Sequence, residues 1–328
     1  MRRRHDAGCR NISQDVQPGE VGACLRVNVF HAVRRAWHMD CSQGVHGVSP
    51  PPDRRLLDGH NVRTALKTLA RAAGIDRMKF AAMRMCCERH VLARVGRSRK
   101  RFIGRILCYH TIGQHEWGVN DVTPAQFRRH IELALNAGYR FVPASHIVRT
   151  GGSARDLAIT FDDGMKSVVT HAAPILKEYG VPWTFFPVSD WTDQKVPWLA
   201  DKCMTWRDVE SLMADGAEMG SHSATHPDFG AIGYAQMVDE LAGSRDLFHR
   251  RLGYAPPTFA IPLGQSMNWK DMALRAAREA GYEVIYAQAE ETRPAGTVAR
   301  TFISKFDGDR IFRALLKGKF DYWEEWVW

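Results

Sequence analysis

Residues 157–164, LAITFDDG, form an apolar run that ends in two adjacent aspartates and a glycine. Neighbouring carboxylates repel each other, so a folded chain tolerates them where solvent or a cation screens their charge. A second stretch, MGSHSATHPDF at 219–229, carries His222 and His226 four residues apart. On one turn of helix this spacing places both imidazoles on the same side. Two histidines and one carboxylate are three protein ligands, which leave one coordination position open, as in a catalytic zinc site.

Each of these motifs also has a structural explanation. An Asp-Asp-Gly run after a strand is often only a turn, and two histidines four apart can be surface or capping residues. Both stretches, however, follow a segment that reads as a strand. Their joint occurrence at strand ends therefore favours a metal site over two unrelated structural features.

Strands and helices alternate along the chain from Arg105 onward. The helix expected at 122–139 has Thr123 as N-cap, Pro124 in its first turn and a closing Gly138. The other strands are expected at 105–112, 157–161, 182–189, 217–223, 257–262, 283–288 and 299–306, and the other helices at 166–180, 206–216, 234–253, 268–282 and 309–318. About seven such units with buried strands predict an α/β fold with a parallel sheet that can close into a barrel. In such barrels chemistry gathers at the C-terminal ends of the strands.

The two motifs also carry a family resemblance. TFDDG at 160–164 followed by HSATH at 222–226 resembles the polysaccharide deacetylase family, the NodB-homology domains of carbohydrate esterase family 4. The similarity spans about residues 104–316. It implies a distorted (β/α)7 barrel and a divalent metal, usually Zn²⁺ and in some members Co²⁺ or Ni²⁺.

The resemblance implies a role for each residue of the two motifs. Asp163, His222 and His226 are expected to hold the metal, and Asp162 is expected to be the general base. The physical chemistry agrees, because a divalent ion beside Asp163 relieves the Asp–Asp repulsion and lowers the pKa of a bound water toward about 7. Asp162, kept ionised by the same cation, can then accept the proton of that water.

The third segment of the family pattern departs here. It normally contains an Arg-x-Pro-Tyr-Gly-like run, but 259–264 reads FAIPLG, with Ala260 in the place of the arginine and Leu263 in the place of the tyrosine. The backbone N–H of Leu263 can still serve as an oxyanion donor, or this stretch is simply a loop after a strand. The arginine normally orients the catalytic aspartate, and no D-x-x-D-W-like partner segment is obvious either.

The family's C-terminal histidine is also absent, because 298–306 reads VARTFISKF. We expect His110 to take its place as general acid, since the first and last strands of a barrel are neighbours. The alternative is a structural histidine bonded to a loop carbonyl. Four tryptophans, at 117, 191, 198 and 269, are either sugar-stacking platforms or core residues.

The N-terminal third differs from the rest. Residues 1–100 hold 20 Lys and Arg against 8 Asp and Glu, a balance of +12, whereas the remainder holds 25 against 28. Residues 1–60 are expected to be disordered or non-native, 61–100 to form basic amphipathic helix, and 101–328 to form the deacetylase-like domain. The helix is expected to pack on that domain, with a membrane-surface contact or a nucleic-acid contact as the alternatives. No nucleic-acid-binding motif is present, so we expect no nucleic-acid partner.

The expected location is the cytoplasm. The seven cysteines show no disulfide-scaffold spacing and suit reduced thiols, and we find no signal peptide or membrane-spanning run. The expected activity, implied by the resemblance, is removal of an N-acetyl group from an amino sugar. Two alternatives stay open: hydrolysis of non-sugar amides such as cyclic imides on the same barrel, and a glycan-binding protein that has lost turnover.

Overall fold

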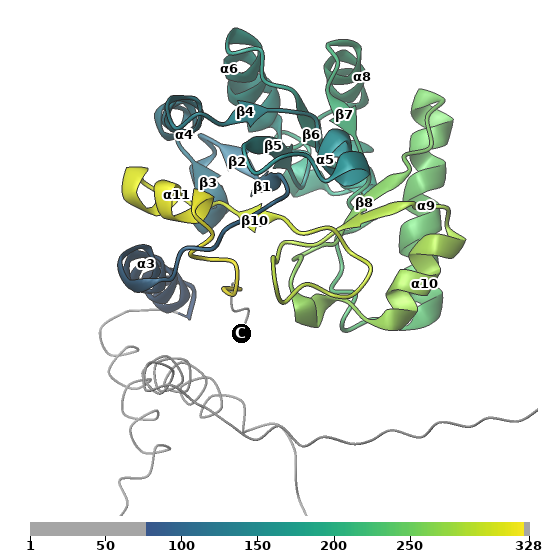
Figure 1. Cartoon of the computed structure of the whole chain (residues 1–328). Coiled ribbons are helices and arrows are strands. Elements are labelled where there is room, and N and C mark those ends of the chain that lie inside the picture. Colours follow the sequence, from purple (N-terminus) through teal and green to yellow (C-terminus); the bar gives the residue numbers. More distant parts are fainter. Residues whose placement is uncertain (1–76, 325–328) are drawn as a thin grey trace, which may run out of the picture. The chain divides into compact units, whose positions relative to one another are not determined.

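A parallel sheet forms the centre of the structure, a computed structural model that describes residues 77–324 (Figure 1). In the described residues this sheet has six strands, five of them in the order β10-β1-β5-β6-β7, with β4 pairing beside β5. The strands are β1 (Arg105–Tyr109), β4 (Arg140–Phe141), β5 (Asp156–Phe161), β6 (Trp183–Phe185), β7 (Glu218–Met219) and β10 (Thr301–Phe302). β1 and β5 are buried along their whole length, as the apolar runs in the sequence indicate.

Four further strands form two small parallel pairs. β2 (Thr111–Ile112) pairs with β3 (Asp121–Val122), and β8 (Thr258–Ala260) pairs with β9 (Val284–Tyr286). Single bridges join Phe259 to Ser221, which follows β7, and Tyr286 to Val298, which precedes β10, so the β8–β9 pair lies between the two edge strands of the main sheet. The expected α/β fold with parallel strands is therefore confirmed, and its ring is distorted because full ladders occur on one side only.

Helices cover the outside of this ring. They are α3 (Arg77–Val95), α4 (Pro124–Asn136), α5 (Ala144–Thr150), α6 (Ala173–Glu178), α7 (Ser189–Thr192), α8 (Trp206–Ala214), α9 (Tyr234–Leu252), α10 (Asp271–Glu279) and α11 (Asp309–Leu316). Thr123 caps α4, accepting a hydrogen bond from Gln126 N at 3.2 Å, as its place before Pro124 predicted. Among the ring strands only β9 is not followed by a helix, since residues 287–300 form a loop.

Aromatic side chains fix the ends of β1 and β5. The rings of Tyr109 and Phe161 both pack near Phe127 of α4, with centroid distances of 5.1 and 5.7 Å in edge-to-face geometry. All three side chains are fully buried. Such pairs add specific geometry to apolar burial, so the two strand ends have little freedom to shift.

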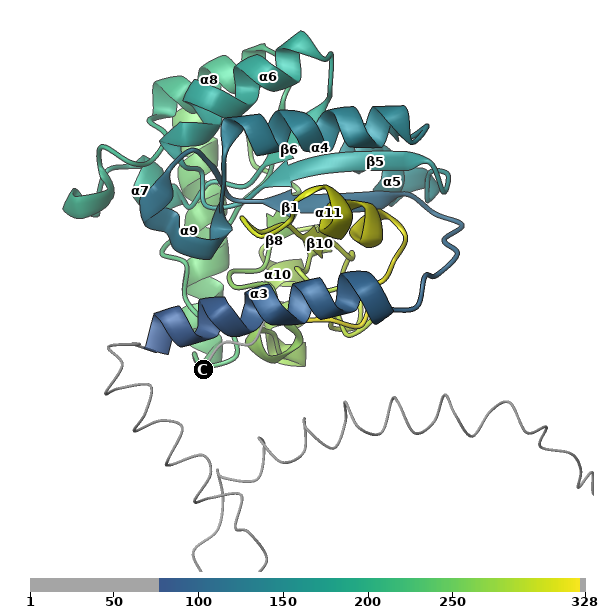
Figure 2. The ribbon, with the colours of Figure 1, turned by 90° about the vertical axis from the view of Figure 1, so that its left-hand side faces the viewer.

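The helix α3 packs along one side of the ring, below α11 in the view of Figure 2. Its anchor is Arg89, which is fully buried and pairs with Asp307 at 2.5 Å. The guanidinium also lies over the rings of Phe320 and Trp323, 5.0 and 4.8 Å from their centroids. Residues 1–60 and 61–76, for which we expected an extension and more helix, lie outside the described residues. None of the helices in the described part is both long and apolar enough to cross a bilayer.

Candidate metal centre

The two aspartates stand where β5 ends. The N–H of Asp162 donates to the carbonyl of Tyr109 at 3.0 Å, so it still belongs to the β1–β5 ladder. Asp163 and Gly164 then adopt left-handed backbone, with φ of 70° and 72°. A Cβ at Gly164 would lie 2.6 Å from Pro187, so only glycine fits there. The tight turn explains why two adjacent carboxylates face different partners.

The two histidines lie on a loop after β7, and the expected helical turn is wrong. Ser223 and His226 have left-handed backbone, with φ of 69° and 66°, which interrupts any helix. The loop is closed by side chains instead, because the Ser223 hydroxyl accepts the N–H of His226 at 2.9 Å. The carboxylate of Glu240, on α9, accepts the N–H groups of residues 224 and 225 at 3.0 and 2.8 Å. The two imidazoles still meet, with ring centroids 4.9 Å apart.

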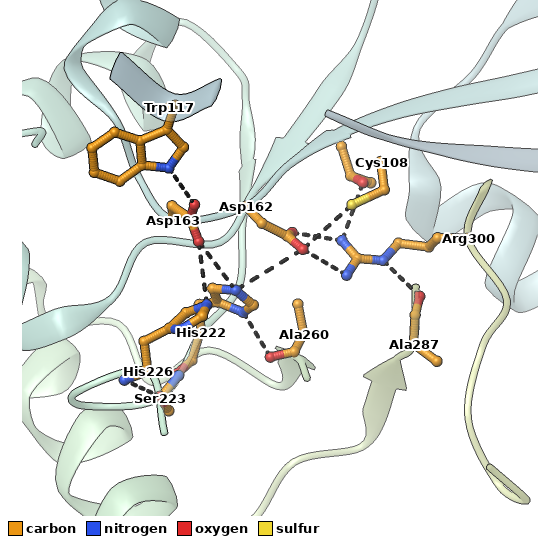
Figure 3. Close-up of polar contacts among 12 residues, drawn as sticks. Cys108, Trp117, Asp162, Asp163, His222, Ser223, His226, Ala260, Ala287 and Arg300 are labelled. Carbon is orange, nitrogen blue, oxygen red and sulfur yellow. Dashed lines mark hydrogen bonds and ion pairs between the residues drawn. The ribbon is translucent and has the colours of Figure 1, made fainter. Parts of the chain in front are cut away.

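The carboxylate of Asp163 faces both imidazoles (Figure 3). Its Oδ1 lies 3.5 Å from Nε2 of His222 and 3.4 Å from Nε2 of His226, and it is buried without a hydrogen bond among the described residues. Nδ1 of His222 lies 2.8 Å from the carbonyl of Ala260. If the imidazole is neutral and donates to that carbonyl, its Nε2 directs a lone pair at the carboxylate.

This donor set fits a divalent ion. Two lone pairs and an anionic oxygen that converge in a buried place repel one another unless a cation lies between them. Tetrahedral bonds of about 2.1 Å place neighbouring ligand atoms about 3.4 Å apart. The observed spacings of 3.4 and 3.5 Å match that geometry. Asp163, His222 and His226 are thus the residues that can hold a metal.

Opposite charges dominate the electrostatics of the cluster. Burial alone would raise the pKa of Asp163, but the neighbouring imidazoles outweigh it and hold that pKa well below its usual range. At His226 burial has the larger effect and lowers the pKa to about 4, although the charge of Asp163 opposes this shift. In contrast, the charges of Asp162 and Asp163 overcome burial at His222 and raise its pKa. An ionised carboxylate beside a neutral His226 suits metal ligation, since ligands bind in their deprotonated forms.

Asp162 has a partner that the sequence did not reveal. Arg300 donates from Nη1 and Nη2 to the two carboxylate oxygens of Asp162, at 2.6 and 2.8 Å, and is itself fully buried. Its Nε donates to the carbonyl of Ala287 at 3.0 Å. Burial would raise the pKa of Asp162, but the positive charge of Arg300 outweighs it, and the pKa lies below its ordinary value. A buried arginine thus pairs with this aspartate, although Ala260 stands in the place of the family's arginine.

A signal for Arg300 was present in the sequence. It opens the run RTFI of the last strand, where a charged side chain would be buried at a high desolvation cost unless a partner meets it. Asp162 was the unpartnered acid in the same barrel. Nothing local joins the two, because they lie 138 residues apart and meet only when β10 pairs with β1.

His110 lies directly after β1, on the same side of the sheet as the aspartates. It is buried, its Nδ1 has no partner among the described residues, and its ring meets the edge of Phe302 on β10. It forms a second cluster with Cys108 and Asp162. We assign no metal there, because Arg300 occupies both oxygens of Asp162. Burial holds the pKa of His110 below its usual value, although Asp163 and Asp162 oppose that shift.

Leu263 lies in the loop after β8. Its backbone is left-handed, with φ of 63°, and its N–H makes no hydrogen bond among the described residues. Gly264 follows with a φ of 68°, and a Cβ there would lie 2.9 Å from the backbone nitrogen of Gln288. The Leu263 N–H is therefore unpaired, although no contact links it to the metal-ligand cluster.

The four tryptophans have different environments. Trp117 donates from Nε1 to Asp163 Oδ2 at 3.1 Å, and Trp191 stacks on His226 with a centroid distance of 5.4 Å. Trp269 belongs to the core, with 6% of its surface exposed, whereas Trp198 is 65% exposed. Two of the four thus contact metal-ligand candidates directly, a role that the sequence did not indicate.

Backbone strain is concentrated here. Five non-glycine residues have positive φ in the described part of the chain, and four of them are Asp163, Ser223, His226 and Leu263. Left-handed backbone is unfavourable for residues with a Cβ and persists where the surroundings enforce it. This clustering coincides with the turns around the two aspartates, the two histidines and Leu263, the candidate site residues.

Comparison with known proteins agrees with this geometry. Residues 150–285 match the family model described as polysaccharide deacetylase. A chitooligosaccharide deacetylase from Sinorhizobium fredii is 27% identical over 43% of this chain and 60% of its own length. A peptidoglycan-N-acetylglucosamine deacetylase from Bacillus cereus is 23% identical over 47% of this chain and 52% of its own length. The alignments with the first curated relatives span about three fifths of those proteins.

Solved structures show the same fold. The deacetylase PplD from Streptococcus pyogenes, in complex with acetate, superposes with a TM-score of 0.56 at 21% identity, covering 67% of this chain and 98% of that one. IcaB from Ammonifex degensii superposes with a TM-score of 0.57 at 21% identity, covering 66% and 98%. At this identity the likeness concerns the fold.

Proposed function

The chain belongs to the polysaccharide deacetylase family, and from this premise we propose that it is a metal-dependent hydrolase that removes the N-acetyl group of an amino sugar. The proposed substrate is an oligosaccharide, a polysaccharide precursor or a glycolipid. One observation carries the proposal most directly: a buried, unpaired Asp163 oxygen faces two imidazole nitrogens at 3.4 and 3.5 Å, next to an Asp162 that Arg300 keeps ionised.

The metal proposed for this site is Zn²⁺, with Co²⁺ or Ni²⁺ as alternatives, held by Asp163, His222 and His226. When bound, such an ion supplies Lewis acidity that makes water a nucleophile near neutral pH and polarises the amide carbonyl. The carbonyl of Ala260 orients the His222 ring, and the indole of Trp117 holds the second oxygen of Asp163. These contacts fix the orientation of the ligand side chains.

The hydrolysis needs one base and one acid. Asp162 accepts a proton from the water while the water oxygen attacks the carbonyl carbon. The backbone N–H of Leu263 donates a hydrogen bond to the developing oxyanion. The carbon–nitrogen bond then breaks, and the departing amine takes a proton that we assign to His110. The products are acetate and the free amino sugar. Arg300 does not contact the reacting atoms in this scheme; it positions Asp162 and keeps it charged.

The test is turnover by purified, metal-loaded protein on N-acetylated chitooligosaccharides, peptidoglycan fragments and cyclic imides. Mass spectrometry should show loss of acetyl groups from at least one glycan, with equimolar acetate, and turnover about a thousandfold lower in Asp162→Asn. Activity on the imides alone would replace the sugar proposal by the non-sugar amide alternative. Glycan binding that is equal in wild type and Asp162→Asn, without turnover in either, would show a binding protein.

A further inference from the structure

The outward face of α3 carries an apolar stripe. Met83, Val91 and Val95 are 50%, 49% and 74% exposed, and Cys87, also exposed, lies between them at the same four-residue spacing. Residues four apart lie one above another on a helix, so the stripe is continuous over about 18 Å. Met85, Arg89 and Ala93, on the opposite face, are buried against the domain. The helix is thus apolar on two faces, and only one of them is covered within the described residues.

The loop after α3 extends this surface. Phe102 is 85% exposed and Ile103 is 52% exposed, the largest such pair of adjacent apolar residues in the described chain. The loop is held in place by Gly104, whose N–H donates to the carbonyl of Gly151 at 2.8 Å. β1 starts directly after this loop, so the loop lies at the N-terminal ends of the strands, at the end of the sheet opposite the aspartates (Figure 2).

The same segment is strongly basic. Residues 77–103 contain nine Lys and Arg and a single acidic residue, Glu88. Arg89, Arg99 and Arg101 are paired with acidic side chains of the domain. In contrast, Arg94, Arg97 and Lys100 are exposed and form no ion pair with any residue that the structure describes. The apolar side chains are therefore flanked by unneutralised positive charge.

A hollow of about 350 Å³ adjoins this surface, between α3 and the start of α11. His90, Arg94 and Arg310 line it, as does Asp309, whose carboxylate accepts a hydrogen bond from Arg129 at 2.8 Å. Basic groups next to exposed apolar side chains match the two parts of a lipid surface, anionic headgroups and acyl chains.

We propose that α3 and the 96–103 loop form a docking surface for an anionic lipid bilayer, with Phe102 and Ile103 entering the interface and Arg94, Arg97 and Lys100 contacting headgroups. A second copy of the chain fits less well, because a symmetric contact through this stripe would bring two basic segments together. Residues 1–76 carry 12 Lys and Arg against 7 Asp and Glu, so they offer no acidic complement either. A nucleic acid would neutralise the positive charges but would leave the aliphatic stripe exposed to water.

The test is co-sedimentation of the full chain with vesicles of phosphatidylcholine alone or mixed with phosphatidylglycerol. We expect binding to the mixed vesicles only, a fall of about tenfold or more in Phe102→Ser/Ile103→Ser, and about a hundredfold in Arg94→Gln/Arg97→Gln/Lys100→Gln. The matched control is Met267→Ser/Met272→Ser, which removes two apolar side chains of 58% and 45% exposure elsewhere and should leave binding unchanged.

Three results would overturn the proposal. If the Phe102→Ser/Ile103→Ser variant and the Arg94→Gln/Arg97→Gln/Lys100→Gln variant both bind as wild type does, other residues, such as the basic 1–76 segment, attract the vesicles. Equal loss of binding in the Met267→Ser/Met272→Ser control would show a nonspecific apolar effect. If the wild type binds duplex DNA but not vesicles, and the Arg94→Gln/Arg97→Gln/Lys100→Gln variant loses this binding, the occupant is a nucleic acid. Vesicle binding is measured without turnover, so its outcome is independent of the proposed hydrolase activity.

Discussion

The two ends of β5 each carry an aspartate paired with an arginine, and the two pairs differ in burial. At the start of the strand Asp156 pairs with Arg140, whose side chain is 68% exposed. At the end of the strand Asp162 pairs with Arg300, whose side chain is fully buried. An exposed arginine keeps most of its hydration. A buried arginine loses its hydration, and only the interaction with its partner can offset this desolvation cost.

The difference in burial indicates which of the two ion pairs has a role other than stabilising the fold. A buried ion pair is weak evidence for stabilisation, because apolar residues of similar volume often serve as well. Arg300 nevertheless directs two hydrogen bonds at the carboxylate that lies next to the metal-ligand cluster. We therefore expect the Asp162 pair to control activity and the Asp156 pair to affect only folding.

The largest expected difference in kcat is between the variant that removes the Asp162 carboxylate and the variant that removes the Asp156 carboxylate. Asp162→Asn should lower kcat by about a thousandfold, within the range for loss of a general base. Asp156→Asn should leave kcat within twofold, because it lies at the other end of the strand. Initial rates on the best N-acetylated substrate, with bound metal determined for each variant, check this. Equal loss in both variants would mean that β5 acts through its folding alone.

The next largest difference in kcat is expected between the variants that remove Arg300 and Arg140. Arg300→Met leaves Asp162 buried without its countercharge, which should cost about 3–5 kcal/mol of unfolding free energy and lower kcat by about a hundredfold. Arg140→Met should change the activity by less than twofold, since its pair is open to solvent. Urea denaturation and steady-state kinetics measure both quantities. An Arg300→Met variant with wild-type kcat would contradict the positioning role.

Moving the arginine to another position tests whether Asp162 needs a guanidinium nearby or needs Arg300 itself. Ala260 stands where the family resemblance places the orienting arginine, and its carbonyl already contacts His222. Ala260→Arg in an Arg300→Ala background should restore part of the lost activity, about tenfold, if a guanidinium near Asp162 is what the reaction needs. The single variant Ala260→Arg is the control for steric damage. No recovery, with both variants folded and metal-loaded, would show that the position of Arg300, directly before β10, is itself essential.

The smallest expected effect is a pH dependence of stability at the start of β5. The hydrogen bond from Arg140 lowers the pKa of Asp156 from 3.8 to about 2, against the effect of burial. A group whose folded pKa is depressed stabilises the fold above its unfolded pKa, and this contribution is lost as the pH falls through the folded value. Arg140→Gln should therefore flatten the stability profile between about pH 4 and pH 2. Unfolding midpoints across that range measure it, and an unchanged profile would exclude the pair as the cause.

Local sequence was sufficient for part of the site. TFDDG and HSATH each lie within a few residues of a strand end, and the parallel order of the strands brings Asp163 to His222 and His226. The parallel α/β fold was predictable for the same reason, because apolar runs and helix caps alternate from Arg105 onward.

Contacts between distant segments were not predictable in the same way. Arg300 meets Asp162 only because β10 pairs with β1, and the family match at 150–285 includes neither strand. The loop shape at 222–226 was also missed, since its closure depends on Glu240 from α9 rather than on the helical spacing of the histidines. Trp117 reaches Asp163 through a short 3-10 helix, His115–Asn120, that carries no recognisable motif.

The most direct test of the account is a metal analysis of the purified full chain beside its Asp163→Ala variant. Elemental analysis after dialysis should give one divalent ion per wild-type chain, and anomalous scattering at the edge of that metal should place it between Asp163, His222 and His226. The Asp163→Ala protein should remain folded and lose the ion. A wild-type protein that takes up no divalent metal, or an Asp163→Ala variant that binds it equally well, would contradict the metal site on which the proposed hydrolase depends.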